Sequence, residues 1–113
     1  MIRAITIKRK WAELIAQGVK RFEVRDYRVD YLGPLVITIS GEKIAYAVVD
    51  LIGFQSAELT PSLSAEERQF GKWAWVLSNP QRCVAVPCVG KLGPWYWNAA
   101  LPELLRPVQL AML

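Results

Sequence analysis

Three ionisable side chains stand close together near the start of the 113-residue chain: Lys20, Glu23 and Arg25. A lysine ammonium can hold a phosphate, or act as a base where burial lowers its pKa. An arginine fork suits bidentate contacts to a phosphate or a base edge, and a carboxylate can accept from the exocyclic amine of cytosine. On a regular strand, Glu23 and Arg25 share a face and lie close enough to pair. The trio is therefore either a binding or catalytic site, or a structural Glu23–Arg25 pair beside a solvated Lys20.

Positive charge is concentrated in the same part of the chain. Residues 1–30 hold eight basic and four acidic side chains, whereas residues 31–113 hold six of each, so the net charge of +4 comes from the first quarter. Localised positive charge attracts polyanions, of which nucleic acid is the commonest in a cytoplasm, although it also serves simply to solvate a surface. The further candidate nucleic-acid contacts are the cations and stacking aromatics Lys8, Lys10, Trp11, Arg21, Trp75 and Lys91.

Several chemistries are excluded or disfavoured by composition. The chain has no histidine, which excludes imidazole-based catalysis and histidine-bearing zinc sites. The two cysteines, Cys83 and Cys88, are too few for an all-cysteine zinc site, and on a regular strand they point to opposite faces, so we expect free thiols. No metal or cofactor is expected. The sequence lacks an apolar run of the roughly 18 residues that span a bilayer, and its start does not resemble a signal peptide, so we expect a cytoplasmic protein with no membrane partner.

Short strands dominate the pattern of hydrophobic residues, with one helix early and another late. Trp11, Leu14 and Ile15 have helical spacing, and Gly18 ends that helix. Ser64 and Glu67 fit a capping box at the start of a second helix. Turns are expected at 33–34, 40–42 and 79–80, and strands at 2–8, 19–25, 35–39, 44–54, 73–77 and 82–89. The fold class predicted is α+β: a small, mostly antiparallel β-barrel with flanking short helices.

The residues around the charged trio also form a longer pattern, Trp11-x-x-Leu14-Ile15-x-x-Gly18-x-Lys20-x-x-Glu23-x-Arg25. This resembles the signature of the ASCH domain (activating signal cointegrator homology), a branch of the PUA-like superfamily. Further blocks resemble that family in the same order, at residues 33–37, 73–77 and 87–95. The resemblance covers about residues 3–97. We therefore expect an ASCH domain at residues 1–97, followed by a Leu-rich tail at 98–113 that packs on the domain or on a partner.

The resemblance implies a PUA-like barrel with a cleft lined by the Lys, Glu and Arg of the motif, which receives RNA, DNA or a nucleoside. Some relatives hydrolyse N4-acetylcytidine and some cleave single-stranded RNA. The amidohydrolases of the family carry a threonine nucleophile three residues after the lysine, and here that position is Glu23. That departure puts the same hydrolysis by the same nucleophile in doubt.

Two main functional hypotheses follow. The first is a binding module that holds RNA or a modified nucleotide, with DNA possible, in an open groove along which Lys8, Lys10, Arg21 and Arg25 are spread. The alternative is a small hydrolase, a nuclease on single-stranded RNA or an amidohydrolase on an acylated nucleoside, in which Lys20 and Glu23 are catalytic and face each other in a narrow cleft with little solvent. A third possibility is an interaction domain whose Leu-rich tail binds a partner or a second copy.

Overall fold

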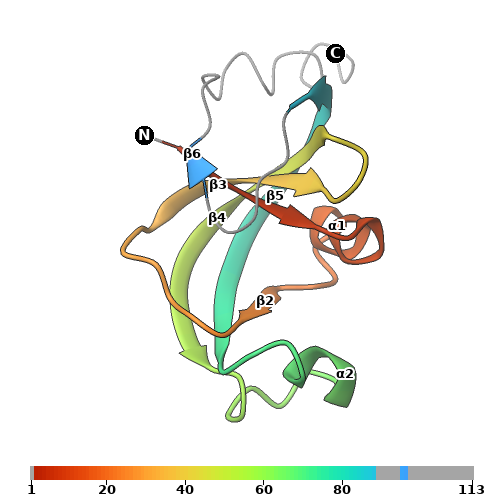
Figure 1. Cartoon of the computed structure of the whole chain (residues 1–113). Coiled ribbons are helices and arrows are strands. Elements are labelled where there is room, and N and C mark those ends of the chain that lie inside the picture. Colours follow the sequence, from red (N-terminus) through yellow and green to blue (C-terminus); the bar gives the residue numbers. More distant parts are fainter. Residues whose placement is uncertain (1, 89–94, 97–113) are drawn as a thin grey trace.

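A computed structural model describes residues 2–88 and 95–96 of the chain. One six-stranded sheet carries two short helices, as Figure 1 shows. The sheet order is β2-β5-β4-β3-β1-β6; β1 and β3 run parallel, and every other neighbouring pair is antiparallel. The elements are β1 (Arg3–Ile7), α1 (Arg9–Ala16), β2 (Phe22–Arg25), β3 (Gly33–Ile39), β4 (Ile44–Ser56), α2 (Ala65–Arg68), β5 (Trp73–Pro87) and β6 (Trp95–Tyr96).

The long strands β4 and β5 bend along their length, so the sheet curves into a half barrel (Figure 1). The predicted α+β, mostly antiparallel, barrel-like class is confirmed. The concave side holds the main core, where buried Ile5, Ile37, Leu51 and Trp75 pack with residues of α1. α1 contributes Ile15, which is 1% exposed, and so fixes the C-terminal end of that helix against the sheet.

The two helices begin and end largely as their sequences predict. Gly18 follows the C-cap of α1 with φ of +76°, a conformation that glycine adopts without steric cost. The start of α1 has no side-chain cap, as expected from Lys8 at that position. At α2, the Ser64 hydroxyl accepts from the Glu67 amide while the Glu67 carboxylate accepts from the Ser64 amide, which confirms the capping box.

Two predicted turns are wrong. Gly33 and Pro34 lie inside β3, paired with β4. Asn79 and Pro80 do not separate two strands but lie within the single strand β5, where both stand opposite one residue of β4, between the pairs Ser78↔Asp50 and Gln81↔Val48. This is a β-bulge, and Asn79 takes the positive φ of 50° that the extra residue requires.

The connection between β3 and β4 and the state of the cysteines are as the sequence predicts. β3 and β4 form the expected antiparallel hairpin, joined by residues 40–43 rather than 40–42. Cys83 and Cys88 are free thiols, as expected. No helix within the described ranges is long and apolar enough to cross a membrane. The predicted tail at 98–113, Lys91 and most of the 87–95 block lie outside the described residues.

Candidate functional site

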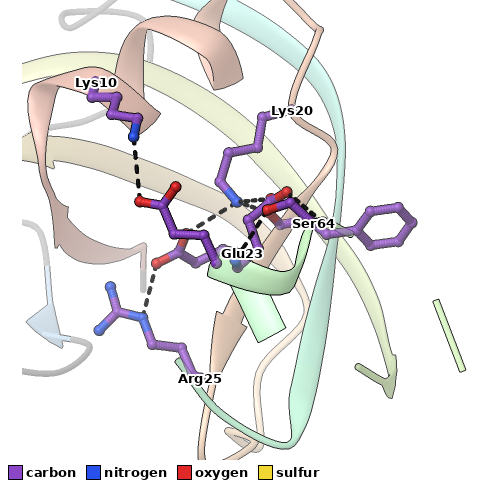
Figure 2. Close-up of polar contacts among 8 residues, drawn as sticks. Lys10, Lys20, Glu23, Arg25 and Ser64 are labelled. Carbon is purple, nitrogen blue, oxygen red and sulfur yellow. Dashed lines mark hydrogen bonds and ion pairs between the residues drawn. The ribbon is translucent and has the colours of Figure 1, made fainter. Parts of the chain in front are cut away.

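Four charged side chains converge where β2, the end of α1 and α2 meet (Figure 2). Lys20 comes from the connection between α1 and β2, Glu23 and Arg25 come from β2, and Glu67 comes from α2. We call these four residues the Lys20 network. The carboxylates of Glu23 and Glu67 both face the ammonium group of Lys20, so Lys20 is the centre of the network.

Lys20 is almost completely enclosed, because only 7% of its side chain is exposed. Its Nζ lies 3.0 Å from Oε2 of Glu67 and 3.8 Å from Oε1 of Glu23, and it also donates to the Phe22 carbonyl. The same Nζ lies 5.2 Å from the centroid of the Trp11 ring, within cation–π range. The sequence hypothesis of a solvated Lys20 is therefore wrong.

Glu23 and Arg25 form the ion pair that their strand spacing predicts. Nε of Arg25 lies 3.1 Å from Oε2 of Glu23, and Nη2 of Arg25 donates to the Thr6 carbonyl at 3.1 Å. Arg25 thus connects β2 to β1, two strands that are not neighbours in the sheet. Its guanidinium bridges the Thr6 carbonyl and the Glu23 carboxylate, and so holds that carboxylate in place.

The two carboxyl groups of the network have pKa values displaced in opposite directions. Burial raises the pKa of Glu23 above its usual value, even though Arg25 and Lys20 both act to lower it. At Glu67, desolvation is the largest single influence and also acts upward, but hydrogen bonds from the Ser64 amide and Lys20 outweigh it, so the pKa of Glu67 is lowered. The pKa of Glu23 therefore lies above, and that of Glu67 below, the ordinary value of a glutamate.

A pocket of about 270 Å³ opens beside the network, and we call it the polar pocket. Its lining combines cations, carboxylates and two aromatic rings: Lys8, Lys20 and Arg25, Glu23 and Glu67, Trp11 and Phe70. A larger hollow of about 480 Å³ also touches Lys20, but no carboxylate lines it. The polar pocket is the better candidate because its polar groups converge on one space.

The structure brings five of the predicted site residues to this pocket: Lys8, Trp11, Lys20, Glu23 and Arg25. Of the other four predicted residues, Lys91 lies outside the described residues, and Lys10, Arg21 and Trp75 do not line the pocket. Two of them are on the surface outside its lining: Arg21 is exposed and lines neighbouring hollows, and Lys10 lies 3.3 Å from Glu66, as Figure 2 shows.

Trp75 corrects one prediction. Its side chain is 0% exposed, its Nε1 donates to the Tyr27 carbonyl, and the rings of Tyr27 and Phe54 contact it edge-on. Trp73 and Trp75 are two residues apart on β5, a spacing that puts side chains on the same face of a strand. Trp75 is in the core, so it cannot stack on a base in this structure. The partly exposed member of the pair is Trp73.

Five lining residues of the pocket were not among the predicted site residues, and two of them, Glu67 and Phe70, offer a charge or an aromatic ring to a ligand. Glu67 carried a visible signal, the capping box, but that signal explains only its contact with Ser64 and not its ion pair with Lys20, 47 positions earlier. Phe70 is 49% exposed and lines the pocket without any local motif. Within the described residues, no group of three or more cysteine or acidic side chains is arranged to hold a metal ion.

The curved sheet with β1 and β3 parallel and short helices at its sides has the fold of solved ASCH structures. The crystal structure of ASCH from Zymomonas mobilis superposes with a TM-score of 0.71 and 16% sequence identity, covering 96% of this chain and 94% of that one. The structure of a variant of the same Zymomonas mobilis protein gives a TM-score of 0.71, 15% identity and coverage of 96% and 97%.

Similarity at this level of identity establishes the fold, and it confirms the ASCH-type fold that the sequence motif predicts. No family model matches the sequence, and no curated protein matches it. The function must therefore be argued from the residues of the pocket.

Proposed function

We infer that the polar pocket binds one base of RNA or of a free or modified nucleotide, with DNA as a possible ligand. The observation that carries this proposal is the convergence of one buried carboxylate, three cations and two aromatic rings on a space of about 270 Å³. Ligand pockets are usually about 300 Å³ or larger. A space at this lower limit suits a base or a nucleoside and is too small for a duplex.

Each group in the pocket matches a part of a nucleotide. The Glu23 carboxylate can accept from an exocyclic amine, which cytosine and adenine carry. Trp11 and Phe70 offer apolar surface to the base, where each stack contributes roughly 1–3 kcal/mol. Lys8 is exposed at the rim and can contact a phosphate. Arg25 is held in place by Glu23 and Thr6, so little side-chain freedom is lost when a ligand binds.

The test is a titration of the protein with nucleoside monophosphates and with short single-stranded RNA and DNA, followed by Trp fluorescence and by fluorescence anisotropy. We expect binding that Glu23→Gln weakens about tenfold or more, because the amide presents a donor where the ligand amine needs an acceptor. Lys43→Gln is the matched control, since Lys43 is in the β3–β4 connection and does not line the polar pocket. Equal affinities of wild type and Glu23→Gln would contradict the proposal.

A second candidate function, a small hydrolase, is favoured by one specific observation. Lys20 and Glu23 face each other with side chains only 7% and 12% exposed. This is closer to the narrow cleft expected of an enzyme than to the open groove expected of a binding module. A carboxyl group whose pKa is raised by burial also suits general acid–base catalysis near neutral pH.

In an amide hydrolysis at this site, Glu23 would accept a proton from water as the water oxygen adds to the acyl carbon. Lys20 would stabilise the negative charge on the acyl oxygen. Glu23 would then deliver the same proton to the departing amine as the carbon–nitrogen bond breaks, releasing the nucleoside and a carboxylic acid. The network supplies both groups without the threonine that the family's amidohydrolases use.

Incubation with an acylated cytidine and with single-stranded RNA separates the two functions. Release of cytidine, or shortening of the RNA on a gel, by wild type but not by Glu23→Gln would establish the hydrolase. Intact substrates together with Glu23-dependent binding would establish the binding module.

A further inference from the structure

A second hollow is lined by cations and an indole. This hollow has a volume of about 510 Å³ and we call it the Trp73 hollow. It is lined by Ser56, Ala57, Glu58, Arg68, Gly71, Lys72 and Trp73. Only Trp73 of this lining belongs to a block of the sequence resemblance, and none of the lining residues is among the predicted site residues.

The two spaces share a boundary made of consecutive residues. Phe70 lines the polar pocket, while Gly71, Lys72 and Trp73 line the Trp73 hollow. Gly71 packs so closely on Arg25 that a Cβ at this position would lie 2.3 Å from the Arg25 carbonyl carbon. Arg25, which lines the polar pocket, is also the cross-strand partner of Trp73. The two linings are therefore connected along the chain at residues 70–71 and across the β2–β5 pair at Arg25 and Trp73.

The charge of the Trp73 hollow is positive. Arg68 and Lys72 stand against one acidic residue of the lining, Glu58. Arg28 adds a third cation, because its Cζ lies 4.3 Å from the centroid of the Trp73 ring. Over residues 2–88 and 95–96, neither Arg28 nor Lys72 takes part in an ion pair.

Stacking on Trp73 orients the Arg28 guanidinium. An arginine plane held in this way can receive a stacked base on its free face or bind a phosphate with its fork. Lys72, exposed beside it, is a suitable phosphate contact. Arg68 donates to the Thr60 carbonyl at 2.9 Å, which holds its guanidinium at this hollow. A single nucleotide in the polar pocket would contact none of the three cations, whereas the next nucleotide of a strand would bring its phosphate and base to them.

We propose that the Trp73 hollow is a second nucleotide subsite, in which Arg28, Arg68 and Lys72 hold the phosphate and base adjacent to the nucleotide in the polar pocket. The ligand is then a single-stranded polynucleotide rather than a free nucleoside. A single strand is favoured over a duplex because a base that enters the polar pocket must leave its stack, which costs least in a single strand. This inference rests on the proposed binding of a base in the polar pocket.

The experiment compares a fluorescein-labelled single-stranded RNA of about ten nucleotides, and the same DNA sequence, with nucleoside monophosphates as competitors. Affinities are measured at several salt concentrations for wild type, Arg28→Gln/Lys72→Gln, Glu23→Gln and the control Lys43→Gln. Arg28 and Lys72 are exposed, so the double variant should fold like wild type, and circular dichroism checks this. Trp73 is left unchanged because it packs against the core.

We expect wild type to bind the oligomer more tightly than any monophosphate. The double variant should lose about tenfold in affinity for the oligomer, with the slope of log K against log salt reduced by about 1.4, since each phosphate contact on a single strand contributes about 0.7. Its affinity for monophosphates should be unchanged. An oligomer affinity and slope equal to those of wild type, or monophosphates bound as tightly as the oligomer, would overturn the second subsite.

Failure of the proposed function is distinguishable from failure of this inference. If wild type binds neither monophosphates nor oligomers, the pocket proposal is wrong and the second subsite is overturned with it. If oligomer binding depends on Arg28 and Lys72 but not on Glu23, the Trp73 hollow is supported and the polar pocket is not the base site.

Discussion

Two clusters of charged residues of similar composition flank α1, and they differ mainly in burial. The Lys20 network holds side chains that are 7–21% exposed. The second cluster consists of Arg9, Glu13 and Glu42, with side chains 39–44% exposed, and we call it the Arg9 cluster. In both, a cation lies between two carboxylates. The same residue types thus occur once beside a pocket and once on the surface.

The carboxyl groups show what burial changes. In the Arg9 cluster, hydrogen bonds from Arg9 lower the pKa of Glu42, as is usual for a solvated ion pair. In the Lys20 network, desolvation raises the pKa of Glu23 despite two adjacent cations. In the exposed pair, the pKa of the carboxyl group is thus shifted in the direction expected for an ion pair. In the buried network, the pKa of Glu23 is shifted the other way, so its protonation can change when a ligand binds.

The largest expected effect comes from removing the buried cation. Lys20→Met leaves two carboxylates facing each other without their shared ammonium, and should lower the free energy of unfolding at neutral pH by about 3–5 kcal/mol. Urea denaturation measures this, and the loss should shrink in acid as Glu23 becomes protonated. Lys10→Met, which removes an ion pair whose side chains are about 60% exposed, is the control. An equal loss in both variants would remove the distinction between buried and exposed pairs.

The second largest expected effect tests whether the close packing of Gly71 positions α2, and with it Glu67, beside Lys20. In Gly71→Ala, the new methyl group would lie 2.3 Å from the Arg25 carbonyl carbon and 2.4 Å from the Asp26 amide nitrogen, so backbone must move. We expect a loss of about 1–3 kcal/mol in the free energy of unfolding, together with weaker ligand binding as Glu67 is displaced from Lys20.

Gly53→Ala is the matched control for Gly71→Ala, because a Cβ there meets no heavy atom within 4 Å. It should leave both stability and ligand binding close to wild type. Similar losses in the two variants would show that close packing at Gly71 does not position α2.

A smaller effect concerns pH, and its sign differs between the two carboxyl groups of the network. The folded-state pKa of Glu23 is raised, so its contribution to stability is full below its unfolded pKa and is lost as pH rises through the folded value. The folded-state pKa of Glu67 is lowered, so its contribution is present above its unfolded pKa and is lost as pH falls. Relative to Glu23→Gln, wild type should therefore become less stable with rising pH; relative to Glu67→Gln, it should become more stable.

Urea denaturation from about pH 4 to about pH 8 checks both trends in the same buffers. If the free energy of unfolding of wild type and of Glu23→Gln changed with pH in the same way, the pKa of Glu23 would not be shifted by folding. That result would remove the main support for acid–base chemistry in the pocket.

The sequence predicted most of the fold because its signals are local. The spacing of Trp11, Leu14 and Ile15, the glycine after α1 and the capping box of α2 each act within a few residues. Asn79–Pro80 shows the limit of such signals. The same residue types suit a turn and a bulge, and the choice depends on β4, which continues beside them and pairs on both sides of the extra residue.

The site was predictable where its residues share one strand or its flank. The spacing of Glu23 and Arg25 on one strand was sufficient to predict their ion pair, which forms, but it left open whether Lys20 joins them or is solvated. The contribution of Glu67 depends on how α2, more than 40 residues later in the chain, is placed beside Lys20, which no local pattern encodes. The prediction for Trp75 was wrong for the same reason. The alternation of a strand predicts the side to which a side chain points, but not that the rings of Tyr27 and Phe54 enclose it.

The smallest effect is expected from a substitution in the exposed Arg9 cluster. Glu42→Gln removes the carboxylate that accepts from Nε of Arg9 at 2.7 Å, yet Arg9 keeps Glu13 at 3.1 Å and remains 5.5 Å from the Tyr46 ring. Water can replace the lost contact because the partners are exposed, so the urea midpoint should not move measurably, with or without added salt. Ligand binding should also be unchanged, since neither residue lines the polar pocket. A clear loss of stability in Glu42→Gln would mean that the Arg9 cluster fastens α1 to the β3–β4 connection, and that burial is not what separates the two clusters.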